Sequence, residues 1–124
     1  MSGKRILLVD DEPDILTVFK RSLEREGFEV QAYSHPLEAF EKFHPYYVDL
    51  LIFDFKMREM NGFELYKRIR EIDKNAKVCF LSADEHHYKE QQQGLSELDA
   101  TYFLHKPISM SPFVAKVKDI LQTK

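Results

Sequence analysis

The sequence predicts an α/β fold in which a parallel β-sheet is covered by helices on both faces. Five short apolar runs recur at near-regular intervals, and the segments between them show helical periodicity. Apolar runs without alternating polar residues are typical of strands that are buried on both faces of a parallel sheet. The length of 124 residues suits one domain with its own hydrophobic core, which we expect to occupy residues 1–124.

The predicted strands follow directly from these apolar runs. They are Ile6–Val9, Phe28–Ala32, Leu50–Phe53, Val78–Leu81 and Thr101–Leu104. Because crossover connections between parallel strands are right-handed, few topologies remain, and 2-1-3-4-5 is a common doubly wound order for five strands. We therefore expect a flavodoxin-like (βα)5 sandwich with the strand order 2-1-3-4-5.

Four of the intervening helices are predicted from apolar residues that recur every three or four positions. Their apolar faces are Ile15, Phe19 and Leu23, then Leu37, Phe40 and Phe43, then Leu65, Ile69 and Ile72, and finally Phe113, Val117, Ile120 and Leu121. Pro13 and Gly27 suit the two ends of the first helix. Pro45 stops the second helix, and Asn61 suits the start of the third. The polar residues 84–99 are expected to form a short, exposed helix.

Composition and charge argue against several classes of protein. Cys79 is the single cysteine, so an internal disulfide framework is excluded and a reducing, cytoplasmic location is expected. The net charge is -3 and no block of like charge stands out, which argues against direct binding of nucleic acid. No apolar stretch approaches the length that crosses a bilayer, so we expect no membrane partner.

Side chains that can carry chemistry follow four of the predicted strands. They are Asp10 and Asp11 after the first strand, Asp54 after the third, Ser82 after the fourth and Lys106 after the fifth. In this strand order, ligands bind in the crevice outside the carboxyl ends of the first and third strands. Three carboxylates and one ammonium group there would be neutralised by one divalent cation. Mg²⁺ prefers such hard oxygen ligands, so the sequence predicts a magnesium site.

A metal ion beside a lysine and a hydroxyl group suits the stabilisation of charge on a transferring phosphoryl group. The carboxylate that the metal leaves available can act as the nucleophile and form an acyl phosphate. Asp54 is the best candidate for this nucleophile, because it stands alone on a central strand between the acid pair and the Ser82 and Lys106 side chains.

The sequence also resembles a known family. The motifs "ILLVDDEPD", "LLIFDFKMREMNGFELYKRIRE", "VCFLSA" and "YFLHKPIS" occur in the order found in the receiver domain of two-component response regulators. The resemblance covers the chain from Lys4 to about Leu121. It implies that Asp54 accepts a phosphoryl group from the phosphohistidine of a sensor histidine kinase or phosphotransfer protein. It also implies a downstream effector protein or a fused output domain that reads the signal.

The resemblance assigns the metal ligands residue by residue. It implies that Asp11 binds Mg²⁺ directly and that Asp10 acts through a metal-bound water. Asp54 itself and the backbone carbonyl of Lys56 complete the set. In the loop beside the predicted metal site the sequence departs from the family pattern, because Arg58 stands where a proline is common and Asn61-Gly62 stands where Asp-Gly is common.

The switch is assigned in the same way. Ser82 and Lys106 correspond to the residues that bind the new phosphoryl oxygens, and Phe103 corresponds to the aromatic switch residue. The resemblance implies that movement of Ser82 opens space for Phe103, which shifts the surface of the fourth helix, fifth strand and fifth helix. Phe103 lacks the hydroxyl group of the frequent tyrosine, so this switch would depend on packing alone.

Three other readings of the sequence are open. A metal-dependent phosphatase with an aspartyl nucleophile would need a second aspartate two residues past Asp54, where Lys56 stands. A phosphate-independent interaction domain of the same fold is disfavoured by the acids and Lys106. A flavin-binding protein is disfavoured because no phosphate-binding loop rich in Ser, Thr or Gly follows the first strand. On the favoured reading, the domain is not an enzyme, because it catalyses its own phosphorylation and dephosphorylation and nothing else.

Overall fold

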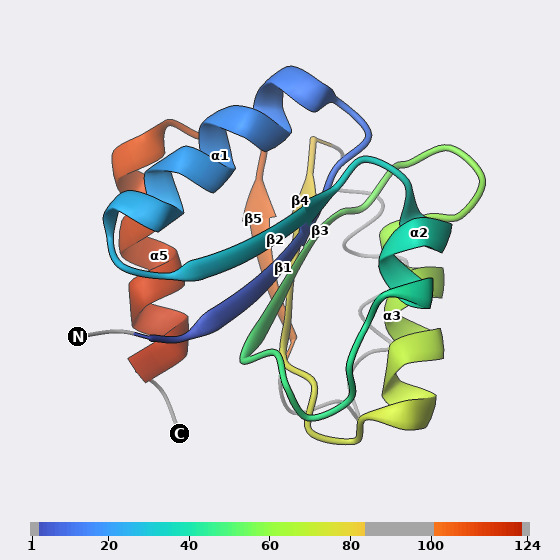
Figure 1. Ribbon diagram of the computed structural model, residues 1–124. Helices are drawn as coiled ribbons and strands as arrows, with labels where there is room; N and C mark the ends of the chain where they lie inside the picture. The colour runs from blue at the N-terminus through green and yellow to red at the C-terminus, as the bar shows by residue number, and fades with distance from the viewer. Residues whose placement is uncertain (1–2, 84–100, 123–124) are drawn as a thin grey trace.

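The computed structural model describes residues 3–83 and 101–122 and forms an α/β sandwich (Figure 1). The predicted helix over residues 84–99 lies outside the described residues. In chain order the elements are β1 (Arg5–Val9), α1 (Pro13–Arg25), β2 (Glu29–Tyr33), α2 (Pro36–Glu41), β3 (Leu50–Asp54), α3 (Gly62–Ile72), β4 (Val78–Ser82), β5 (Thr101–His105) and α5 (Met110–Gln122).

All five strands are parallel and follow the order β2-β1-β3-β4-β5, which confirms the predicted topology. Helices α1 and α5 cover one face of the sheet, and α2 and α3 cover the other (Figure 1). Val9 pairs with Phe53, Phe53 with Phe80, and Phe80 with Phe103. This register brings the carboxyl ends of β1, β3, β4 and β5 to one edge of the sheet.

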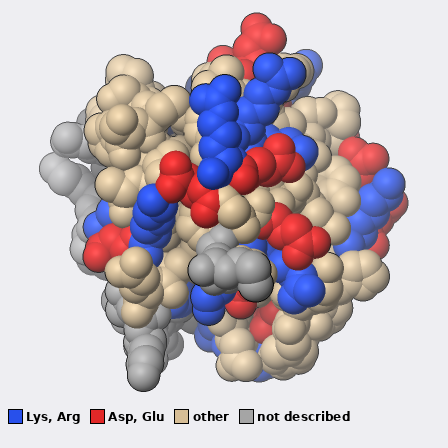
Figure 2. Space-filling view, turned by 60° about the vertical axis from the view of Figure 1, so that its left-hand side comes forward, with Lys and Arg blue, Asp and Glu red and all other residues tan. Residues whose placement is uncertain are grey.

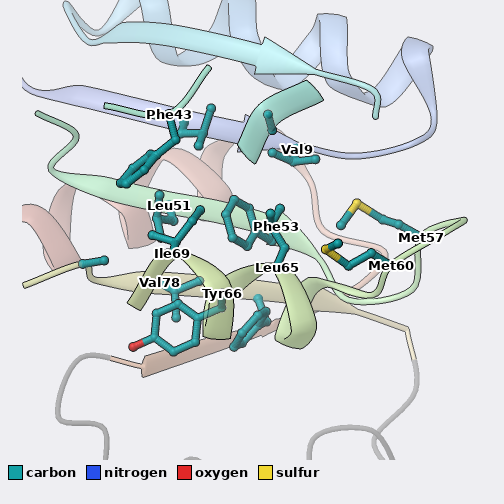
Figure 3. Packing of buried hydrophobic residues seen from close by; sticks show 14 of the residues in the cluster. Val9, Phe43, Leu51, Phe53, Met57, Met60, Leu65, Tyr66, Ile69 and Val78 are labelled. Carbon is teal, nitrogen blue, oxygen red and sulfur yellow. The ribbon is translucent and has the colours of Figure 1, made fainter. Parts of the chain in front are cut away.

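The central strands are buried on both faces, as their continuous apolar sequences predict. Every residue of β3 and β4 is buried. On one side Phe53 packs with Leu65 and Ile69 of α3, in the cluster drawn in Figure 3. On the other side the rings of Phe19 and Phe113 stack with centroids 4.2 Å apart and join α1 to α5. Two apolar layers therefore hold the sheet rigidly between its helices.

The predicted ends of α1 and the predicted start of α3 are confirmed, whereas α2 ends at Glu41, four residues before the proline, Pro45, that was expected to stop it. Pro13 lies in the first turn of α1, and Gly27 takes a left-handed φ of 92° just after that helix ends. Asn61 begins α3 with a capping box, in which its Oδ1 accepts a hydrogen bond from the Glu64 amide at 2.8 Å. The Glu64 carboxylate in turn accepts one from the Asn61 amide at 2.9 Å. This cap fixes the point at which the loop after β3 becomes helix.

Some predicted faces and bounds differ from the structure. Strand β2 begins and ends one residue later than expected. Leu37 and Ile72, both predicted to face the core, are exposed. In α3 the buried residues Leu65 and Ile69 are four positions apart, and the next buried residue is Asp73, directly after the helix. Ile72 therefore faces solvent. In α2 the buried line begins at Pro36 instead of Leu37 and the helix ends at residue 41, so Phe43 is buried beyond it.

The surface carries interspersed charges of both signs. On the face drawn in Figure 2, acidic and basic side chains lie beside one another. Among the described residues, no helix is both long enough and apolar enough to cross a membrane.

Candidate functional site

Lys106 joins acids from two different strands at the carboxyl edge of the sheet. Its Nζ lies 3.2 Å from Asp10 Oδ2 and 3.2 Å from Asp54 Oδ1. Asp10 directly follows β1, Asp54 is the last residue of β3, and Lys106 directly follows β5. The structure therefore brings together three of the side chains that the sequence analysis assigned to one site.

Three carboxylates gather at this point. Oxygen atoms of Asp10, Glu12 and Asp54 all lie within 4.8 Å of one another. Asp10 is fully buried and Asp54 is 6% exposed. Glu12 is exposed, and its Oε1 lies 3.7 Å from Lys106 Nζ. The sequence analysis did not assign Glu12 to the site, although it is the third acid of the run that follows β1.

Asp11, which was expected to bind the metal directly, is not one of these three carboxylates. Its Oδ2 accepts a hydrogen bond from the backbone amide of Arg58 at 3.3 Å. The Nε atom of Arg58 lies 3.7 Å from the same oxygen. The Asp11 carboxylate is therefore engaged by the loop between β3 and α3.

The pKa values of the buried groups reflect crowding of like charge. Burial raises the pKa of Asp54 to about 6, repulsion from Asp10 adds to this, and Lys106 acts in the opposite direction. Burial also raises the pKa of Asp10, against the hydrogen bond from the Glu12 amide and the charge of Lys106. Burial alone lowers the pKa of Lys106, but Asp54 and Asp10 outweigh it, so this pKa is raised.

The donor set fits a hard divalent cation such as Mg²⁺. The clustered ligand atoms are carboxylate oxygens, which Mg²⁺ prefers over nitrogen or sulfur. Asp10, Glu12 and Asp54 outnumber the one ammonium group that contacts them. A divalent cation would compensate this surplus of negative charge, which adds, after burial, to the raised pKa of Asp54.

Ser82 lies at the same edge of the sheet, on the strand next to β3. It is the last residue of β4 and is buried, and its carbonyl oxygen accepts a hydrogen bond from the Lys106 amide at 2.9 Å. The Lys106-Pro107 peptide bond is cis. The backbone that carries Lys106 is thus attached directly to the end of β4.

Phe103 lies within a group of packed aromatic rings. The centroid of the Phe103 ring is 5.2 Å from that of Phe80, which is also 5.8 Å from both Phe55 and Tyr66. Phe55 directly follows Asp54 in the chain. Continuous packing therefore runs from the end of β3 to the predicted switch residue.

The loop after β3 carries two further features of the site. Lys56 is exposed in this loop, and the role of its carbonyl as a metal ligand stays a prediction. Gly62, to which the sequence analysis gave no role in the site, lies against the end of β3. A Cβ atom at Gly62 would be 2.6 Å from the carbonyl oxygen of Asp54. Glycine is required here by close contact, a signal that a single sequence does not reveal.

Among the described residues, the group of possible metal ligands contains carboxylates and neither a cysteine nor a histidine. Cys79 is fully buried in β4, and burial raises the pKa of its thiol to about 12. His105 is exposed at the end of β5, as expected, whereas the His86-His87 pair lies outside the described residues.

Comparison with known proteins identifies the family. Residues 6–118 match the family model for the response regulator receiver domain. The chain is 34% identical over 97% of its length to the alkaline phosphatase synthesis transcriptional regulatory protein PhoP of Bacillus subtilis, of which the match covers 49%. It spans about half the length of the first transcriptional regulatory proteins that it matches.

Solved structures give the same relationship. The non-phosphorylated HemR receiver domain of Leptospira biflexa is 26% identical, with a TM-score of 0.85 over 98% of this chain and 96% of that one. The response regulator TrrA of Thermotoga maritima, solved in complex with Mg²⁺-BeF, is 35% identical, with a TM-score of 0.78 over 94% and 98%. Fold, sequence motifs and comparisons agree: the chain belongs to the response regulator receiver domain family.

Proposed function

We propose that this receiver domain is switched by phosphorylation of Asp54, with a sensor histidine kinase or a phosphotransfer protein as the donor. The observation that carries the proposal is the position of Lys106, whose ammonium group lies 3.2 Å from both Asp10 and Asp54. A buried nucleophile beside a fixed cation suits attack on an anionic group. Receiver domains are signalling switches and not conventional enzymes, and membership of this family disfavours the phosphatase alternative.

In this proposal Mg²⁺ would be held by Asp54 and Asp11, with Asp10 acting through a metal-bound water and, by resemblance to the family, the carbonyl of Lys56 as a further ligand. Glu12, which lies in the same group of carboxylates, would add an acidic oxygen at this edge. When bound, the ion would compensate the negative charge that accumulates as a phosphoryl group approaches the carboxylates. TrrA, which was solved with Mg²⁺-BeF, supports this choice of metal.

The side chains of the domain divide the remaining work. With a pKa of about 6, Asp54 is ionised at neutral pH and can act as a nucleophile. One of its oxygens attacks phosphorus as the bond from phosphorus to the donor's imidazole nitrogen breaks, and the electron pair stays on that nitrogen. Lys106 keeps its proton because its pKa is raised, and it places positive charge beside the new acyl phosphate. In this sense the domain catalyses its own phosphorylation, and hydrolysis of the acyl phosphate resets it.

Phosphorylation would change the surface of the domain through a change in side-chain packing. The Ser82 hydroxyl would donate a hydrogen bond to a phosphoryl oxygen, and Phe103 would move into the space that the Ser82 side chain leaves. Phe103 packs on Phe80, so its movement would change the exposed surface of β5 and its neighbours. The effector or fused output domain would bind one of the two packings better than the other, which is what a population shift requires.

A groove beside the site suits the donor protein. It has a volume of about 530 Å³, lies between α1 and the loop after β5, and includes Lys106 in its lining. Most of its other lining residues are apolar, and Val18 is half exposed there. An apolar helix face on the donor would cover this groove while presenting its phosphohistidine to Asp54. We expect the domain to work in the cytoplasm, because its single cysteine, Cys79, is free and suits a reducing compartment.

Two donors test this proposal. Acetyl phosphate with Mg²⁺ should label the wild type on one residue, and Asp54→Asn should abolish the labelling detected by mass spectrometry. Val18→Asp should leave labelling by acetyl phosphate unchanged but slow transfer from a protein donor about tenfold, because it places a charge in the apolar groove. Full labelling of the Asp54→Asn variant would contradict the assignment of the acceptor. Unchanged transfer to the Val18→Asp variant would contradict the docking site.

A further inference from the structure

Arg58 contacts an acid of the proposed metal site. Its backbone amide donates a hydrogen bond to Asp11 Oδ2 at 3.3 Å, and its Nε atom lies 3.7 Å from the same oxygen. The three carboxylates that do converge are Asp10, Glu12 and Asp54. The guanidinium of Arg58 thus lies against the one acid of this run that is not in the cluster.

The loop holds Arg58 in this place through a tight turn. The Met60 amide donates a hydrogen bond to the carbonyl of Arg58 at 2.8 Å, and Glu59 between them has a left-handed φ of 72°. Met57 and Met60, on either side, are buried in the core cluster (Figure 3). The backbone of Arg58 is therefore fixed at both sides, while its side chain is 84% exposed.

We propose that Arg58 competes with the divalent cation for Asp11 and thereby lowers the Mg²⁺ affinity of the domain. This inference depends on the metal site of the proposed function. A cation that uses Asp11 Oδ2 as a ligand must approach a permanently positive guanidinium that lies 3.7 Å from that oxygen. The domain would then need a higher Mg²⁺ concentration for phosphorylation than one with a neutral residue at this position.

The expected effect is modest, because an ion pair with an exposed arginine is weak. Removal of the charge in Arg58→Gln should tighten Mg²⁺ binding about two- to fivefold. Arg58→Lys, which keeps the charge, should stay within about twofold of the wild type. Arg68→Gln, at an exposed position of α3, is the matched control, because it removes the same charge from a side chain outside the loop that contacts Asp11 and should leave the affinity unchanged.

The experiment is a Mg²⁺ titration of the unphosphorylated protein, followed by the backbone amide signals in NMR spectra. Tighter binding by Arg58→Gln alone supports the inference, as does loss of that gain in an Asp11→Asn background. Unchanged or weaker binding by Arg58→Gln would overturn it, and so would an equal gain in Arg68→Gln or a gain that persists without the Asp11 charge. If the wild type binds no Mg²⁺ at all, the proposed function fails, and the result is distinct from failure of this inference alone.

Discussion

Asp54 and Asp73 are both buried aspartates, but they lie at opposite edges of the sheet. Asp54 is at the carboxyl edge and is 6% exposed, and Asp73 is at the amino edge, between α3 and β4, and is 2% exposed. The Asp73 carboxylate accepts hydrogen bonds from the Tyr46 amide at 2.8 Å and the Asn75 amide at 3.0 Å. Asp54 instead faces Lys106, which it shares with Asp10.

The difference shows two ways of burying a negative charge. Backbone amides are fixed and neutral, so they stabilise the Asp73 carboxylate without bringing in a competing acid. At Asp54, several carboxylates share one ammonium group, and burial together with Asp10 raises the pKa of Asp54 to about 6. The amino edge therefore has a charge that serves the fold, whereas the carboxyl edge keeps a surplus that suits the binding of a cation and a phosphoryl group.

The largest expected effect separates these two acids by chemistry. Asp54→Asn should lose all Mg²⁺-dependent labelling by acetyl phosphate, whereas Asp73→Asn should be labelled to the same extent as the wild type. Quantitative mass spectrometry of both variants checks this, with circular dichroism as the control that each is folded. Equal loss in both variants would mean that the two edges do not differ in function.

The next effect distinguishes Asp73 from Asp54 by their contributions to the stability of the fold. Asp73→Ala should lower the free energy of unfolding by about 1–2 kcal/mol, because it leaves two partly buried amides without their acceptor. One of them belongs to Tyr46, whose left-handed φ of 62° that hydrogen bond helps to hold. Urea denaturation measures the change, and a loss below about 0.5 kcal/mol would show that Asp73 has no such role.

Asp54→Asn should change the free energy of unfolding in the opposite direction. Without divalent cations at pH 7.5, we expect it to raise the free energy of unfolding by about 1–3 kcal/mol. The pKa of Asp54 in the folded state, about 6, is above its ordinary value of 3.8, so the folded state retains the proton longer. Wild-type stability therefore falls as the pH rises from about 4 through 6, and the advantage of the variant grows over the same window.

Thermal melts of both proteins in EDTA between pH 4 and 8 would measure this difference. The two stabilities should draw together towards pH 4, because Asp54 is then protonated in the folded state and begins to bind a proton in the unfolded state, where its ordinary pKa is 3.8. A destabilised Asp54→Asn variant at pH 7.5 would contradict the surplus of negative charge.

The smallest effect concerns Cys79, which lies in β4 between the two edges. Because the thiol is fully buried and its pKa is raised to about 12, it should not react with a thiol reagent in the native protein at pH 8. The denatured protein should react completely, which serves as the control. Rapid reaction of the native protein would mean that the sheet opens far more readily than its packing suggests.

Much of the fold could be predicted because its signals are local. Continuous apolar runs define the strands, and Asn61 and Gly27 define helix ends, since each depends on a few neighbouring residues. The exposure of Ile72 could not be predicted, because the next residue, Asp73, is the buried one. The Asp73 carboxylate accepts hydrogen bonds from the Asn75 amide nearby and from the Tyr46 amide, which is distant in the sequence.

The candidate site was predictable to a similar degree. Asp10, Asp54 and Lys106 meet because parallel strands end at one edge, which topology alone dictates. The choice between Asp11 and Glu12 depends on side-chain directions and on Arg58 in a separate loop. The need for Gly62 depends on a tertiary contact with the Asp54 carbonyl. These details come from contacts between segments that no local pattern encodes.

A Mg²⁺ titration of the wild type, followed residue by residue in NMR spectra, tests the central claim most directly. If the carboxyl edge holds the cation site, saturable shifts should concentrate at Asp10, Asp11 and Asp54, and the amides around Asp73 should not move. No saturable shift at the carboxyl edge, or equal shifts around Asp73, would contradict the account.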